Sequence, residues 1–516
     1  MRQMLYVAMC LSAAALVTST ASEAEVVISS KDGKTSIRGT ISSFEDGMFT
    51  ISTSVGPITL DANLVDCSGE ECPEIDALDQ LVRIAGPQFL LSDLMPDLIR
   101  SYAEQTDSKP ALPIENGASE PVELFRGDNQ LVTFETQTQS PNEAFQALLR
   151  GDVEVVLSDR SINEQEIEAF LIEGMGDLSA PSQESIVAQD GIVALVSGEN
   201  AVKRLSVVEL MEIFAGNVTN WAQLGGSDLP INVYLPDDDG TLAETFELTL
   251  LEPEFLSVTA AAERLPSLED IDNAIANDPG GIGITSLSTF KNSKPVELIA
   301  SCGVPIRSSR FAVKAEDYPF SRRIYMYVAD RELPSHAQKF IDHAKERSSR
   351  QGLNGSAFLG LDPEVATISD HGHQLAYSLA DPVHALEMPS LRAFTQTVFD
   401  AERLSVTFRF NEGSSQLDNK SIADAERLLS HMSDDEFEGR EVLLIGFTDS
   451  IGSGDVNRVL STRRAQQVLD TIDTLSESGV DRGSIQAMGF GEAYPVACDT
   501  TEFGRELNRR VEVWIR

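Results

Sequence analysis

An apolar run that leads through a short polar loop into a long helix constrains the C-terminal part of this chain most strongly. The run from Val442 to Phe447 predicts a strand that is buried on both faces of a sheet. Thr448 and Asp449 end the run, and a loop of small residues leads to a helix that starts near Val456. We therefore predict an α/β layer whose polar side chains gather where the strand ends and the helix begins.

Arg464 is the unusual residue of the predicted helix. On a helical wheel it falls on the same side as the apolar residues Leu460 and Val468. A guanidinium on a packing face is costly unless an anion meets it. Asp449 carries the opposite charge, so the two side chains are suited to a zwitterion, with its ammonium at Asp449 and its carboxylate at Arg464. Alternatively, the two side chains pair with each other or are solvated.

Several spaced motifs resemble the OmpA-like peptidoglycan-binding domain over roughly residues 401–516. They are GFTDSIGSGDVNRVLSTRRAQQV, MGFGEAYPV and GRELNRRVEV, in that order. In that family the aspartate binds the ammonium of the diaminopimelate in a peptidoglycan stem peptide, and the helix arginine binds its carboxylate. The resemblance implies these roles for Asp449 and Arg464. The other residues that it places along the site are Asn457, Leu460 and Arg509.

Strands and helices alternate from about residue 81 to residue 362, which predicts a two-lobed α/β domain with a cleft. Within it, the run DGIVALVSGENAVKRLSVVELMEIFAGNVTNWAQLGG resembles periplasmic phosphate-binding proteins, and IGITSLS and EDYPFSRRIYMYV resemble them more weakly. The resemblance implies the fold of a type II periplasmic binding protein, whose lobes close on a ligand. The candidate solute-binding residues are Ser158, Asp159, Asp239, Gly240 and Thr241.

These candidate residues match the phosphate-binding family only in part. Ser158 and Asp159 match its S-D pair, but Leu235 stands where the later loop of the family has an arginine, and Asp239 stands where it has a serine. The carboxylate of Asp239 would therefore lie where a phosphate should bind. Two like charges about 4 Å apart repel by roughly 4 kcal/mol at an effective dielectric of 20. This repulsion offsets several hydrogen bonds of about 1 kcal/mol each. We therefore expect the fold to be kept and tight phosphate binding to be lost. No small ligand, a cationic or neutral ligand, and a cation held by the aspartates remain alternatives.

The N-terminus has a short basic segment, an apolar core and small residues near Ala21 and Ala24, which predicts a secretory signal peptide over residues 1–24. The formal net charge of −43, from 82 acidic and 39 basic residues, argues against nucleic acid or an anionic membrane surface as a partner. No later stretch approaches the ~20 apolar residues of a membrane-spanning helix. We expect a soluble periplasmic protein, associated with the cell wall at the inner side of the outer membrane.

The cysteines fit an oxidising compartment. Cys67 and Cys72 are predicted to form a disulfide that closes a small loop, and zinc is the weaker alternative because no histidine lies nearby. Cys302 and Cys498 would complete an even count by linking two domains. The H-x-H pair of residues 371–373 has no partner ligands at metal spacing, so we interpret it as ordinary loop. No metal site and no cofactor are expected.

Together these patterns predict a multi-domain α/β protein. Its parts are a signal peptide (1–24), a small β-meander (25–78), a two-lobed domain like a type II periplasmic binding protein (79–362), a linker (363–402) and an OmpA-like α/β sandwich (403–516). The predicted function is noncovalent anchoring to peptidoglycan of a solute-binding module with an altered anion pocket. The alternative is a receptor for phosphate or another small anion that serves an ABC importer. An enzyme is not expected, because we find no Gly-x-Ser-x-Gly, HExxH or P-loop motif.

Overall fold

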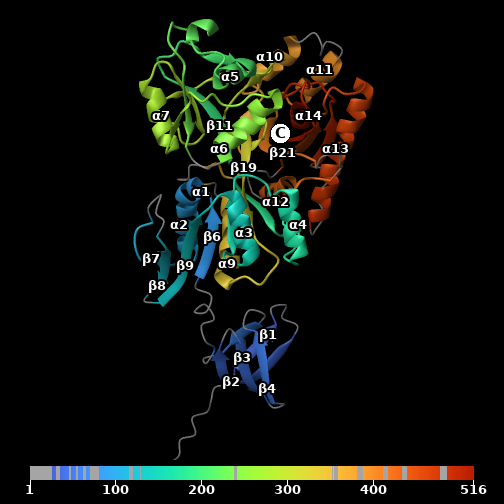
Figure 1. The fold of residues 1–516 in the computed structure, drawn as a ribbon. Coiled ribbons are helices and arrows are strands. Elements are labelled where there is room, and N and C mark those ends of the chain that lie inside the picture. Colours follow the sequence, from blue (N-terminus) through green and yellow to red (C-terminus); the bar gives the residue numbers. More distant parts are fainter. Residues whose placement is uncertain are drawn as a thin grey trace, which may run out of the picture. The chain divides into compact units, whose positions relative to one another are not determined.

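The structure, a computed structural model, describes most of the chain (Figure 1). The described residues are 26–30, 35–45, 48–53, 56–61, 65–69, 72, 81–114, 120–127, 129–237, 241–350, 353, 358–380, 387–410, 416–432, 439–476 and 485–516. The predicted signal peptide lies outside these ranges. The chain forms two compact units, Met1–Gln80 and Leu81–Arg516, which are described separately below. Among the described helices, none has the length and apolar character that crossing a membrane requires.

The first unit is an antiparallel sheet in the order β4-β3-β2-β1-β5. Its strands are β1 (Val26–Ser30), β2 (Ser36–Glu45), β3 (Met48–Thr53), β4 (Gly56–Asp61) and β5 (Val65–Ser68). Strands β1 to β4 follow one another as the predicted meander, and β5 returns to pair with β1. Alternate residues of β1 and β3, such as Val26 and Phe49, form a small apolar core. The predicted disulfide joins Cys67 to Cys72.

The second unit begins with a large mixed sheet in the order β14-β13-β15-β11-β19-β10-β6-β9-β8-β7. Two long strands, β11 (Glu184–Val196) and β19 (Ser321–Tyr327), pair with each other and run between two lobes. The first lobe adds β6 (Leu81–Gly86), β7 (Lys109–Pro110), β8 (Val122–Arg126), β9 (Asn129–Thr138) and β10 (Val155–Ser158). The second lobe adds β13 (Asn232–Pro236), β14 (Glu263–Leu265), β15 (Gly281–Ser286) and β16 (Lys294–Pro295).

Helices cover both faces of this sheet, which explains why its strands are continuous apolar runs. In β10, for example, Leu157 belongs to one buried core and Val156 to the core on the opposite face. The first lobe has α1 (Gln88–Asp93), α2 (Met95–Gln105), α3 (Pro141–Arg150), α4 (Glu164–Ile172) and α9 (Ser335–Arg350). The second lobe has α5 (Val207–Phe214), α6 (Thr241–Phe246), α7 (Leu268–Asn277) and α8 (Arg310–Lys314), with a small sheet of β12 (Arg204–Ser206), β17 (Glu297–Ile299) and β18 (Pro305–Ile306). This is the two-lobed fold that the alternation predicts.

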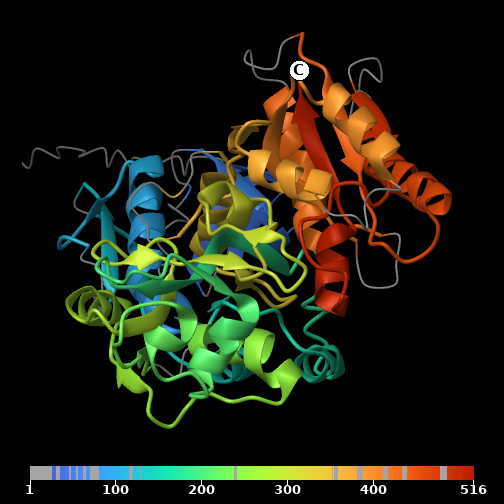
Figure 2. The same ribbon diagram turned by 90° about the horizontal axis from the view of Figure 1, so that it is seen from above.

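The C-terminal domain is a second α/β layer, drawn in orange to red in Figure 2. Its sheet has the order β20-β21-β24-β22-β23. The strands are β20 (Val365–Thr367), β21 (Glu402–Phe408), β22 (Val442–Gly446), β23 (Ile485–Gly489) and β24 (Val511–Ile515), and the helices are α10 (Gly372–Ala380), α11 (Met388–Thr397), α12 (Asn419–Met432), α13 (Gly454–Leu475) and α14 (Glu502–Asn508). Every residue of β22 is buried: Leu444 packs in the core beneath α12 and α13, and Leu443 packs on the other face against α11. The predicted two-sided burial of this strand is confirmed.

Residues 363–380 and 387–402, which belong to the segment 363–402 predicted as a linker, instead pack as part of the C-terminal domain. β20 pairs with β21 along the edge of the sheet. α11 begins with Met388 and places Leu391 and Phe394 in the core that covers Leu443 and Trp514. The physical reason is that β22 and β24 are apolar on both faces, so the second face needs its own cover. The segment has no sustained sequence period, which is why the prediction missed its role.

Polar and covalent contacts tie the C-terminal domain to both lobes. A disulfide joins Cys302 of the second lobe to Cys498. The guanidinium of Arg403, fully buried, binds the carboxylate of Asp317 at 2.6 Å. On the side of the first lobe, Asn419 donates a hydrogen bond to Glu184 at 2.8 Å. The second unit therefore holds the two lobes and the C-terminal domain in one arrangement.

Candidate functional site

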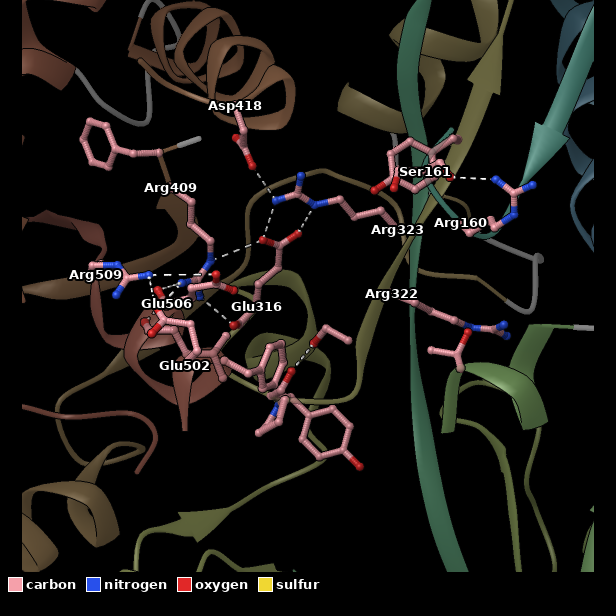
Figure 3. Close-up of a pocket in the computed structure, with 18 of the residues that line it drawn as sticks. Arg160, Ser161, Glu316, Arg322, Arg323, Arg409, Asp418, Glu502, Glu506 and Arg509 are labelled. Carbon is pink, nitrogen blue, oxygen red and sulfur yellow. Dashed lines mark hydrogen bonds and ion pairs between the residues drawn. The ribbon is translucent and has the colours of Figure 1, made fainter. Parts of the chain in front are cut away.

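A cavity of about 1220 Å³ lies between the two-lobed domain and the C-terminal domain (Figure 3). The two-lobed domain lines it with residues that follow β10, with one residue of α6 and with β19 and the loop before it. The C-terminal domain lines it with α13, α14 and residues beside β21 and α12. Asp159 of the predicted solute site and Arg464 and Arg509 of the predicted peptidoglycan site all line this cavity. The structure thus brings one residue of the predicted solute site and two of the predicted peptidoglycan site to a single space, and the cavity lining does not include Ser158, Asp449, Asn457 or Leu460.

Asp449 lies just beyond the end of β22 and is held in a fixed position. One of its carboxylate oxygens accepts a hydrogen bond from Nη1 of Arg509 at 3.0 Å. The other accepts the backbone N–H of Ile451 at 3.1 Å. Arg509 also binds Glu502 at 3.0 Å. Burial of the guanidinium lowers the pKa of Arg509, but the hydrogen bonds to Asp449 and Glu502 outweigh burial and raise it. Asp449 is therefore an anion that already has one cationic partner.

Arg464 projects from α13 into the same region. Within the described residues, its guanidinium has no hydrogen bond and no carboxylate partner, and it lies 5.9 Å from the ring centre of Phe410. Burial and the positive charge of Arg509 lower the pKa of Arg464, and the charge of Asp449 opposes this. Three charged groups, Arg464, Arg509 and Asp449, are thus close enough to act on one another. Arg509 is paired with Asp449 and Glu502, whereas Arg464 has no carboxylate at ion-pair distance among the described residues.

The other two predicted peptidoglycan residues lie differently. Asn457 is only 1% exposed. Its amide donates hydrogen bonds to the carbonyl of Asp449 at 3.3 Å and to the carboxylate of Glu492 at 2.8 Å. Asn457 therefore supports the loop that carries Asp449 from inside. Leu460 is 37% exposed on α13, one helical turn before Arg464.

A network of ion pairs crosses the middle of the cavity wall. Arg323 of β19 binds Glu316 at 2.7 Å and Asp418 of the C-terminal domain at 2.8 Å. Arg409 donates a hydrogen bond to the backbone carbonyl of Glu316 at 2.7 Å. Burial opposes ionisation of Glu316, but Arg323, Lys420 and Arg409 hold the pKa of its carboxyl well below the usual range. These charges neutralise one another and bind the two domains together.

At the cleft end of the cavity, two aspartates share one arginine. Arg322 binds Asp159 at 3.0 Å and Asp190 at 2.6 Å, and all three side chains are buried. Asp190 also accepts a hydrogen bond from the hydroxyl of Ser286 at 2.5 Å. The group contains two carboxyl groups and one guanidinium. The aspartate that the family resemblance assigns to phosphate therefore has an internal cation beside it.

Of the remaining solute-site candidates, the structure describes the side chain of Ser158 only. Ser158 is fully buried, and its hydroxyl both donates to the carbonyl of Arg160 at 2.7 Å and accepts its N–H at 3.2 Å. Asp239 and Gly240 lie outside the described residues, and Thr241 begins α6. The sequence analysis assigned no role to Arg322 and Arg323. Two adjacent arginines within an otherwise apolar strand were the signal that could have found them.

No metal centre is apparent in the part of the chain that the structure describes, where no group of three or more histidine, cysteine, aspartate or glutamate side chains is arranged to hold an ion. The H-x-H pair begins with His371, whose ring packs against Trp514 with 5.8 Å between ring centres. Burial lowers the pKa of His371 to about 4. We interpret His371 as a core histidine.

Comparison with known proteins assigns the two parts of the second unit. Residues 105–345 match the profile of the PBP superfamily domain, and residues 409–509 match the profile of the OmpA family. The chain joins a PBP superfamily domain to an OmpA family domain. Neither family description names an enzyme. The PBP domain contributes the cleft end of the cavity, and the OmpA domain contributes Arg464 and Arg509.

Curated relatives match one domain or the other. Outer membrane porin F of Pseudomonas aeruginosa is 36% identical over 115 residues, which are 22% of this chain and 32% of that protein. Phosphate-binding protein PstS of Bacillus subtilis is 29% identical over 190 residues, which are 35% of this chain and 61% of that protein. The chain thus spans about a third of porin F and about three fifths of PstS. An ABC-type phosphate transport receptor from Vibrio cholerae has 18% identity and a TM-score of 0.40 over 52% of this chain and 96% of its own.

Proposed function

We propose that this protein is a periplasmic, cell-envelope protein that attaches noncovalently to peptidoglycan through its OmpA domain. Arg464 is the observation that carries the proposal: it is a half-buried cation at a cavity wall, and no anion of the described chain meets it. Such a group is costly unless a ligand supplies the anion. The relatives named outer membrane porin F and outer membrane protein A support a place at the cell envelope, which we propose to be the inner side of the outer membrane.

The ligand we propose is the diaminopimelate of the stem peptide, which bears an ammonium beside a carboxylate. Its carboxylate would bind the guanidinium of Arg464, since arginine presents two parallel N–H donors to a carboxylate. Its ammonium would bind Asp449, because a carboxylate has about four lone-pair sites and the contacts to Arg509 and Ile451 use only two. Arg509, which binds Asp449, adds a second positive charge near Arg464.

Co-sedimentation of the full chain with purified sacculi tests this proposal. Arg464→Ala should abolish binding and leave the fold intact, because the side chain has no ion pair to lose. Arg463→Ala is the matched control, since Arg463 is the neighbouring residue on α13 but is exposed. Co-sedimentation of Arg464→Ala at the wild-type level would overturn the proposal.

For the PBP domain, we propose a cleft that does not bind phosphate tightly. The buried group of Asp159, Arg322 and Asp190 holds two carboxyl groups beside one guanidinium, an arrangement that does not favour a further anion. Ser158 uses its hydroxyl within its own turn. The alternative is a receptor for phosphate or another small anion, and the relative named phosphate-binding protein PstS favours it. A titration with phosphate, described in the Discussion, decides between the two.

A further inference from the structure

The cavity has two walls, and only one of them belongs to the OmpA domain. Its volume of about 1220 Å³ exceeds the roughly 300–1,000 Å³ of pockets that hold drug-sized molecules. Arg464 and Arg509 line the cavity, and Asp449, which is not part of the lining, contacts Arg509. A single amino acid bound at Arg464 and Asp449 would leave most of that space unfilled. The cavity is therefore large enough for a ligand that extends from the OmpA domain to the PBP domain.

The wall formed by the PBP domain offers uncharged hydroxyl groups. Ser161, Thr245 and Tyr325 line it, and within the described residues none of their hydroxyls has a hydrogen-bond partner. Burial raises the pKa of Tyr325 to about 12, so its hydroxyl stays protonated and able to donate. The arginines of the same wall are already paired, Arg322 with two aspartates and Arg323 with Glu316 and Asp418. This wall suits the neutral N–H and C=O groups of a peptide better than it suits a free anion.

Several contacts keep this wall in place against the OmpA domain. The disulfide between Cys302 and Cys498 is a covalent tie. The ion pair of Arg323 with Asp418 lies on the cavity wall itself and joins the two domains at 2.8 Å. The second wall is therefore a fixed part of the site.

We infer that the cavity is a composite site for a peptidoglycan stem peptide, whose diaminopimelate binds the OmpA domain and whose neighbouring residues hydrogen-bond to Ser161, Thr245 and Tyr325 of the PBP domain. The inference rests on the proposed function, because it assumes that diaminopimelate binds at Asp449 and Arg464. It assigns the PBP domain a role in reading the peptide. The specificity of the composite site then extends beyond one amino acid.

Calorimetric titration of the full chain with two probes tests the inference. The probes are free meso-diaminopimelate and the tripeptide L-Ala-γ-D-Glu-meso-diaminopimelate. Ser161→Trp fills the cavity from the PBP side at an exposed position, and it should weaken binding of the tripeptide by at least about tenfold. Tyr325→Phe removes one hydrogen bond and should weaken it about fivefold. Both variants should bind free meso-diaminopimelate as the wild type does.

Tyr234→Phe is the matched control, since its hydroxyl binds Asp278 outside the cavity lining. It should leave both affinities unchanged. Tripeptide affinities of Ser161→Trp and Tyr325→Phe equal to that of the wild type would overturn the inference and leave the anchoring proposal standing. Wild-type binding of both probes by Arg464→Ala would overturn the anchoring proposal itself. If thermal unfolding shows that Ser161→Trp does not fold, the Tyr325→Phe result decides.

Discussion

Arg509 donates a hydrogen bond to the carboxylate of Asp449 at 3.0 Å, while Arg464, which acts electrostatically on both groups, has no anionic partner among the described residues. The contact holds the loop after β22 against the C-terminal end of α14. It gives Arg509 a carboxylate partner, whereas Arg464 has none at ion-pair distance among the described residues. In the proposed function, the carboxylate of the ligand would bind Arg464.

Asp449→Asn should weaken binding of free meso-diaminopimelate by about 10- to 100-fold, because a hydrogen bond between charged groups contributes roughly 1.5–3 kcal/mol. The thermal midpoint should change little, since Arg509 keeps its contact with Glu502. Glu502→Gln is the control: it removes the second partner of Arg509 and leaves Asp449 in place. Calorimetric titration checks both variants. Equal losses of affinity in the two would contradict a specific role for Asp449.

Phosphate should not bind the full chain with micromolar affinity. Arg322, which could bind an anion, is already held by the buried carboxyl groups of Asp159 and Asp190. Calorimetric titration with inorganic phosphate is the measurement. Micromolar binding that Ser158→Ala abolishes would contradict this prediction and restore the phosphate receptor as the function of the PBP domain.

Arg322→Met should destabilise the second unit strongly. It leaves Asp159 and Asp190 buried without their cation, a change that typically costs about 3–5 kcal/mol. Arg204→Met is the comparison, because Arg204 forms an exposed ion pair with Glu297 and such pairs contribute little. Thermal unfolding followed by circular dichroism should show a large fall in midpoint for the first variant only. Equal midpoints would mean that the buried aspartates are neutral in the folded protein.

Stability should fall as the pH drops from about 6.5 to about 4, and His371 should account for part of the loss. Burial lowers the pKa of His371 from 6.5 to about 4. In that window the unfolded chain binds a proton that the folded chain does not, so protons favour unfolding by up to about 3 kcal/mol. His371→Gln should reduce the pH dependence of the unfolding free energy in this window. His373→Gln, at an exposed position, should leave it unchanged.

Removal of the disulfide between Cys302 and Cys498 should lower the unfolding free energy of the second unit by about 4 kcal/mol. The bond closes a long loop, with a sequence separation of 196, and long loops gain most from closure. The double variant Cys302→Ser, Cys498→Ser should therefore unfold at a lower denaturant concentration. Cys67→Ser with Cys72→Ser is the control, because that bond closes a loop of separation 5 in the first unit. A double variant as stable as the wild type would mean that the ion pairs alone hold the domains.

Local pattern determined the parts of this protein that depend on neighbouring residues. The run from Val442 to Phe447 predicts a strand buried on both faces, and helical spacing places Arg464 away from solvent, because side-chain direction follows from backbone period alone. The sequence motifs that contain Asp449 and Arg464 also predicted the OmpA domain. Cys67 and Cys72 are so close along the chain that their pairing needed no tertiary information.

Only the tertiary structure decided which distant groups meet. It placed α11 over the second face of the C-terminal sheet, gave Asp159 its partner in Arg322 across 163 positions of sequence, and brought Arg464 to the same cavity as Tyr325. Charge pairing and cavity shape arise from contacts between separate elements, and no local period records them. The sequence therefore pointed to Asp449 and Arg464, and the packing of the two domains decided that Arg464 shares a cavity with Arg322, Arg323 and Tyr325.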